Sequence, residues 1–87
     1  MSVPVHYDRS LLLSEKILYV LSVLKKESIS ELSAEIVELD GIAAEEEVAE
    51  MTRDIEQEIK KMCAEKIVEK LKEHRQKVRY VIVEPEE

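Results

Sequence analysis

Positively charged side chains crowd one short segment near the C-terminal end of the chain. Within ten residues the sequence places six side chains that could contact phosphate groups: Lys70, Lys72, His74, Arg75, Lys77 and Arg79. Glu69 and Glu73 offset part of this charge. The segment predicts either a surface that binds the phosphates of a nucleic acid or a solvated strand face whose charges protect a sheet edge.

Residues suited to nucleophilic, redox or metal chemistry are few and widely separated. His6 and His74 lie near opposite ends of the sequence, and Cys63 is its one cysteine. This spacing offers no pair of Cys or His ligands for a metal, and there is no glycine-rich phosphate loop. Cys63 adjoins the apolar stripe of a predicted helix, which favours a small buried hydrophobe over a reactive thiol. We therefore expect a protein that is not an enzyme and uses no metal or cofactor.

Charge is segregated along the 87 residues, whose formal net charge is -7. Residues 27–58 hold twelve acidic side chains and one base, Arg53, whereas residues 59–80 hold eight bases and three acids. Overall acidity disfavours unspecific binding of polyanions, but the basic segment keeps a local contact open. The absence of Asn and the 38% content of charged residues are typical of proteins from heat-loving organisms.

The sequence favours a cytoplasmic location and no membrane contact. It contains no run of 18 uncharged apolar residues, and its first residues lack the basic and apolar regions of a signal peptide. A single cysteine, which cannot form an internal disulfide, fits a reducing compartment.

Hydrophobic periodicity predicts three helices followed by a β-hairpin in one domain spanning residues 1–87. The first helix covers residues 11–26. A capping box of Ser28 and Glu31 opens the second, whose apolar face is Leu32, Ile36 and Leu39, and Gly41 ends it. The third covers residues 43–65. Strands at 67–72 and 78–83 then pair around a tip at 73–76, with an N-terminal arm at 1–9 and an acidic tail at 84–87.

The first helix carries more apolar surface than one small core needs. Its stripes are consistent either with a central helix packed on several sides or with a helix that also meets a second copy of the chain. For a homodimer the candidate interface residues are Leu11, Leu12, Leu18 and Tyr19.

The order of these elements resembles the winged helix-turn-helix family, including MarR-like and related archaeal transcriptional regulators. Residues 29–36, ISELSAEI, resemble the family's entry into its second helix. Ile55, Ile59, Met62, Ile67 and Val68 resemble a recognition helix that leads into a wing, and residues 77–82 resemble the returning wing strand. The resemblance implies a mainly α-helical fold of three helices and a C-terminal wing.

Two features depart from the family pattern. Lys66 stands where the family usually has Gly, so it must adopt an unfavourable left-handed conformation or the helix must end differently. The 23 residues from Leu32 to Ile55 exceed the usual interval by about three helical turns, which extends the second and third helices by roughly 16 Å beyond the domain.

The resemblance implies a homodimeric DNA-binding regulator of transcription, with the third helix in the major groove and the wing on the backbone. Besides the wing residues, Arg53, Lys60 and Lys61 are the candidate contacts with double-stranded DNA. The carboxylates of the third helix favour an alternative, a module that binds a basic protein partner. A further alternative is one continuous helix over residues 43–74 that forms a coiled-coil dimer.

Overall fold

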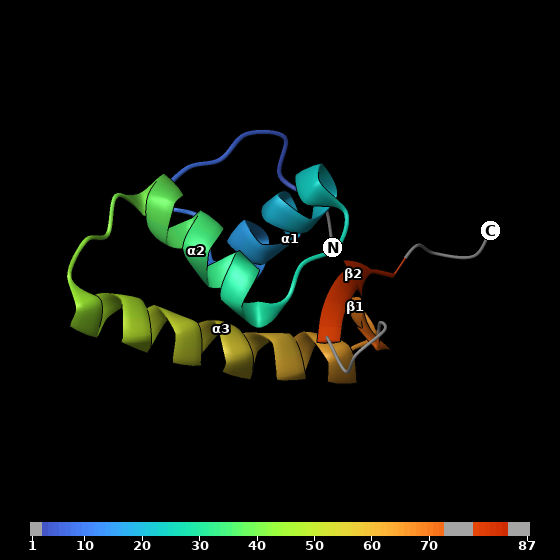
Figure 1. The fold of residues 1–87 in the computed structure, drawn as a ribbon. Helices are drawn as coiled ribbons and strands as arrows, with labels where there is room; N and C mark the ends of the chain where they lie inside the picture. Colours follow the sequence, from blue (N-terminus) through green and yellow to red (C-terminus); the bar gives the residue numbers. More distant parts are fainter. Residues whose placement is uncertain (1–2, 73–77, 84–87) are drawn as a thin grey trace.

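The chain folds into three helices followed by a two-stranded antiparallel hairpin, as predicted (Figure 1). The computed structural model describes residues 3–72 and 78–83. Its elements are α1 (Leu13–Leu24), α2 (Ile29–Asp40), α3 (Glu45–Ala64), β1 (Val68–Lys72) and β2 (Val78–Ile82). This arrangement is mainly helical and winged-helix-like, and because β1 follows α3 the continuous helix over residues 43–74 is wrong.

Local sequence signals fix both ends of α2. The Ser28 hydroxyl accepts a hydrogen bond from the Glu31 N–H at 3.2 Å, and the Glu31 carboxylate accepts the Ser28 N–H at 2.9 Å. At the other end Gly41 is left-handed with φ 70°, and the Ile42 N–H bonds to the Val37 carbonyl at 2.9 Å. The predicted capping box and glycine stop are both confirmed.

The core forms where the three helices meet the base of the hairpin. Its buried apolar side chains are Ile17, Leu18, Val20, Leu21, Leu32, Ile36, Ile55, Ile59, Met62, Val68 and Tyr80. Leu39, which was expected on the buried face of α2, is instead 40% exposed. It lies beside Tyr19 and Val23 of α1 at an open hollow between α1 and α2. The contact of α2 with α3 is made elsewhere on α2, where the Ser33 hydroxyl meets the Thr52 hydroxyl.

Helix α3 is the longest element, with 20 residues and a length of about 30 Å. Its C-terminal half supplies Ile55, Ile59 and Met62 to the core. From Glu45 to Asp54 no side chain is buried. Met51 of this half nevertheless packs against the core, and its Thr52 hydroxyl lies 2.6 Å from the buried Ser33 hydroxyl of α2, so this half lies along α2.

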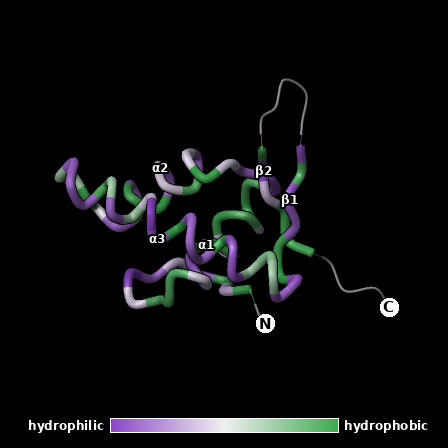
Figure 2. Tube along the Cα trace, turned by 90° about the horizontal axis from the view of Figure 1, so that it is seen from below, coloured by the Kyte–Doolittle hydropathy of each residue, from purple (hydrophilic) through white to green (hydrophobic). Residues whose placement is uncertain are grey.

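The hairpin lies at the C-terminal end of α3, at one end of the helical body (Figures 1 and 2). Within it, Lys70 of β1 is opposite Tyr80 of β2. Glu27, in the turn between α1 and α2, forms a β-bridge with Tyr80: the Tyr80 N–H bonds to the Glu27 carbonyl at 2.8 Å, and the Glu27 N–H bonds to the Tyr80 carbonyl at 3.2 Å. The bridge and the buried Tyr80 ring attach the hairpin to the helices.

Of the two conformations considered for Lys66, the structure shows the left-handed one, with φ 61°. The Lys66 N–H bonds to the Cys63 carbonyl at 3.1 Å, and the Ile67 N–H bonds to the Met62 carbonyl at 2.9 Å. These are the two bonds of a Schellman helix end, the same arrangement that Gly41 forms after α2. A lysine here carries a conformational cost that a glycine does not.

We expect Lys66→Gly to raise the free energy of unfolding by about 0.5–1 kcal/mol, since relief of the left-handed strain exceeds the entropy that glycine adds to the unfolded chain. Urea unfolding measures the change. Lys66→Ala is the control, because it removes the same side chain and keeps the strain. Equal stability of the glycine and alanine variants would contradict this explanation.

Candidate nucleic-acid interface

Exposed lysines gather where α3 ends and the hairpin begins. Lys60 and Lys61 lie on the last turns of α3, and both side chains are exposed. The Lys60 ammonium is 3.6 Å from the Glu56 carboxylate one turn earlier, a solvent-exposed pair that binds weakly. Lys66 is also exposed at the turn into β1. Sequence reasoning missed Lys66 as a site residue, because its position suggested only a helix end.

The two lysines of β1 continue this surface. Lys70 is opposite Tyr80 and Lys72 is opposite Val78, so both lie on the face of the hairpin that carries the apolar side chains of β2. Both lysines are nevertheless exposed. We call Lys60, Lys61, Lys66, Lys70 and Lys72 together the lysine surface; the exposed Glu65 and Glu69 lie among them in the sequence.

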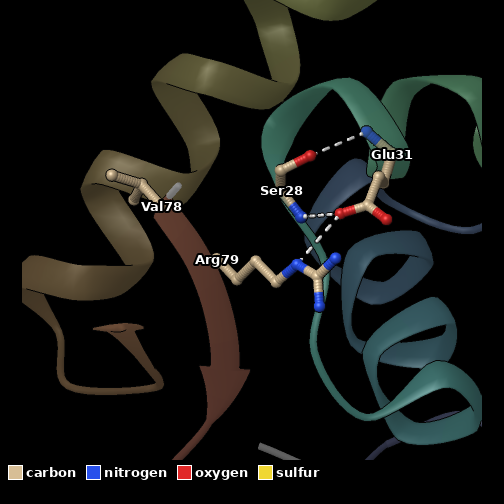
Figure 3. A pocket seen from close by; sticks show the side chains of 4 residues that line it. All are labelled: Ser28, Glu31, Val78 and Arg79. Carbon is tan, nitrogen blue, oxygen red and sulfur yellow. Dashed lines mark hydrogen bonds and ion pairs between the residues drawn. The ribbon is translucent and has the colours of Figure 1, made fainter. Parts of the chain in front are cut away.

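Arg79 lies on the other face of the hairpin. Its partner across the ladder is Leu71, one residue out of phase with Lys70 and Lys72. The Arg79 Nε is 3.4 Å from the Glu31 Oε1, and the two side chains are 27% and 43% exposed (Figure 3). Arg79 turns toward the start of α2, where the Glu31 carboxylate is within reach, and its predicted contact with a phosphate backbone stays a prediction.

Arg53 is not part of the lysine surface. It is exposed on α3, beside Asp54, in the N-terminal half of the helix, where no side chain is fully buried. Lys60 is seven residues further along, or about 10 Å by helical rise. His74, Arg75 and Lys77, which were predicted in the same interface, lie outside the described residues.

The residues predicted for a homodimer interface do not share one environment. Leu12 is 69% exposed, and Leu11 and Tyr19 are half-buried. Tyr19 packs edge-to-face against Tyr7 of the N-terminal arm, with ring centroids 5.5 Å apart. Leu18 is 1% exposed and packs in the core of its own chain, so its assignment to an interface is wrong. The width of the apolar arc on α1 could not reveal which stripe faces inward.

A buried ion pair ties the N-terminal arm and α1 to the end of α2. The Lys16 ammonium is 2.7 Å from the Asp40 carboxylate, with both side chains almost fully buried. The Tyr7 hydroxyl donates to the other oxygen of Asp40. Burial and the neighbouring Asp40 carboxylate raise the pKa of Tyr7, so its hydroxyl keeps its proton. We assign this cluster to stability, since its charges are paired and covered.

Glu27, the residue that forms the β-bridge with Tyr80, lies close to two further carboxyls, those of Glu31 and Glu35. The Glu27 side chain is buried, and its pKa is raised by burial, by a hydrogen bond with Glu31 and by the charges of Glu31 and Glu35. The pKa of Glu31 is lowered, chiefly by the hydrogen bond from the Ser28 N–H. Glu27 is therefore the carboxyl that takes up a proton first, and Glu31 is the one that stays charged.

The remaining side chains give no sign of a reactive centre within residues 3–72 and 78–83. Burial raises the pKa of the half-buried Cys63 thiol and so disfavours the thiolate. No three His, Cys, Asp or Glu side chains of the described part of the chain are grouped to hold a metal ion. None of the helices there has the length and apolarity needed to cross a membrane.

Comparison with known proteins gives no family for this chain: no family model, no curated protein and no solved structure matches it.

The buried Glu27 generates a prediction for pH dependence. Because its pKa is raised by folding, the fold prefers the protonated form, and the cost of burying the charge grows as pH rises through the raised pKa. Glu27→Gln removes that cost, so we expect it to raise the Tm at pH 7–8. At pH 4, where Glu27 is largely protonated, the gain disappears.

Thermal unfolding followed by circular dichroism at several pH values measures this. Glu50→Gln, on the exposed part of α3, is the control and changes the Tm little. A Glu27→Gln variant that is less stable than the native chain at pH 7–8 would show instead that the Glu27 charge supports the fold.

Proposed function

We propose that this chain is a winged-helix DNA-binding protein that acts as a homodimer in the regulation of transcription, and that it contacts duplex DNA through the lysine surface. The observation that carries this proposal is the exposure of five lysines on α3, on β1 and in the turn between them, at one end of the molecule. In a chain with net charge -7, such a concentration of one sign favours a polyanionic partner at that end.

The charge distribution along α3 supports backbone contact over reading of bases. The N-terminal half of α3 bears Glu45, Glu46, Glu47, Glu50 and Asp54, with Arg53 as its one base. Carboxylates on that surface repel phosphates, and few of its side chains suit base edges in the major groove. We therefore propose that the C-terminal end of α3 and β1 contact the sugar-phosphate backbone of DNA, and that binding has low sequence specificity.

Exposed apolar side chains on the body support the homodimer. Leu12 at the start of α1 remains a candidate interface residue, with Leu11 and Tyr19 partly accessible. Val23, Leu24 and Leu39 add further exposed apolar surface. Sedimentation equilibrium tests self-association, and a monomer throughout the micromolar range would contradict this part of the proposal.

A titration of duplex DNA at several salt concentrations tests the lysine surface. We expect Lys70→Gln with Lys72→Gln to weaken binding roughly tenfold at low salt and to reduce the slope of log K against log salt by about 1.8, since each lost phosphate contact removes about 0.9. The matched control is Arg9→Gln with Lys25→Gln, which removes the same charge elsewhere on the body.

The control distinguishes a contact from a change in net charge. If both double variants bind DNA equally well, the lysines of β1 make no specific contribution. If the native chain fails to bind duplex DNA at low salt, the proposed function is wrong.

The alternative is a module that uses the acidic half of α3 to bind a basic protein, and the exposure of Glu46 and Glu50 specifically favours it. Glu46→Gln with Glu50→Gln separates the two functions. For a DNA-binding protein it strengthens DNA binding modestly by reducing repulsion. For the alternative it weakens retention of the protein partner in a pull-down and leaves DNA binding unaffected.

A further inference from the structure

Arg79, a basic side chain of the hairpin, forms an ion pair with a carboxylate of the helical body. Its side chain crosses from β2 to the first turn of α2, where its Nε lies 3.4 Å from the Glu31 carboxylate (Figure 3). The positive charge of Arg79 also acts on Glu27, where it only partly opposes the rise in pKa that burial and the neighbouring carboxyls cause. Arg79 therefore differs from a side chain that only keeps the hairpin surface solvated, because it has acidic neighbours on the helical body.

The contact has the properties of one that can be exchanged. At 3.4 Å it is longer than the 2.7–2.9 Å typical of a strong charge-assisted hydrogen bond. Both side chains keep part of their surface in solvent, and they line an open hollow with Ser28 and Val78. Ion pairs with this exposure add little to stability.

Glu31 is held at the start of α2 by a bond that does not involve Arg79. The Glu31 Oε1 that faces Arg79 also accepts the Ser28 N–H at 2.9 Å, as part of the capping box. That bond keeps the carboxylate at the N-terminus of α2 and holds its pKa below the ordinary value. At neutral pH an anion that approaches Arg79 therefore competes with a fixed negative charge.

The hairpin does not depend on this ion pair for its position. The two backbone hydrogen bonds between Glu27 and Tyr80 and the burial of Val68 and Tyr80 already hold it against the helices. Arg79 can therefore change partners without release of the hairpin from the body.

We propose that Glu31 is an autoinhibitory partner of Arg79, which it withholds from a nucleic-acid phosphate until the phosphate displaces it. The inference rests on the proposed function and assigns a regulated contact to the face of the hairpin opposite Lys70 and Lys72. It implies two modes of contact with DNA: the lysine surface acts at once, and Arg79 adds a phosphate contact only after its exchange.

Glu31→Gln tests this directly. Glutamine removes the charge and retains the capping box, because its side-chain carbonyl can still accept the Ser28 N–H. We expect duplex binding to tighten about three- to fivefold at low salt, the range set by a weak surface ion pair. The slope of log K against log salt steepens by about 0.9, the value for one additional phosphate contact.

The controls separate Arg79 from a general change in charge. Glu38→Gln removes the same charge from an exposed position on α2. In the Arg79→Gln background, Glu31→Gln produces only the change seen with Glu38→Gln, because the additional phosphate contact requires Arg79. If Glu31→Gln does not fold, Glu31→Asp replaces it, because aspartate keeps the charge but holds it further from Arg79. We expect Glu31→Asp to tighten DNA binding by less than the three- to fivefold given for Glu31→Gln, and only when Arg79 is present.

Each outcome decides a different question. If the native chain binds DNA and Glu31→Gln behaves like Glu38→Gln, autoinhibition is wrong and the proposed function stands. If neither the native chain nor Glu31→Gln binds duplex DNA, both fall. If the native chain binds DNA, and Glu31→Gln tightens that binding more than Glu38→Gln does only while Arg79 is present, the inference is supported.

Discussion

Two backbone hydrogen bonds between Glu27 and Tyr80 hold the hairpin against the helical body, and the placement of the charged side chains depends on them. A two-stranded hairpin is marginally stable by itself in water. Here the bridge gives β2 a neighbour on each side, and Tyr80 enters the core formed by the three helices. Once Tyr80 is fixed, the alternation of the strand sends Arg79 to the opposite face. The same bridge draws the Glu27 side chain into a buried position and gives it its raised pKa.

Much of this fold could be predicted because its signals are local. The helices expected at residues 11–26 and 43–65 differ from α1 and α3 by two residues or fewer at each end, and Ser28 and Gly41 mark α2. The surroundings of single side chains could not be predicted in the same way. Leu18 and Leu12 are equally apolar in sequence, yet one is buried and the other exposed, since the orientation of α1 depends on elements far along the chain. The engagement of Arg79 likewise needs Glu31, which only the tertiary fold brings near.

Charge segregation along the sequence becomes segregation along one helix. The first half of α3 has no fully buried side chain and is acidic, while its second half carries Glu56 and Glu58 with Lys60 and Lys61 and leads into the lysines of the turn and β1. A continuous acidic helix would repel DNA throughout, and a continuous basic one would bind it without orientation. The two lysines of α3 lie toward the hairpin end of an element about 30 Å long, while carboxylates occur in both of its halves.

The most direct test of this account is a map of backbone amide chemical shifts by NMR while the protein is titrated with a short DNA duplex. The account predicts changes concentrated on residues 60–72, where the lysine surface lies, with little change on residues 45–54. Changes greatest on residues 45–54 would contradict it, because they would place DNA against the acidic half of α3.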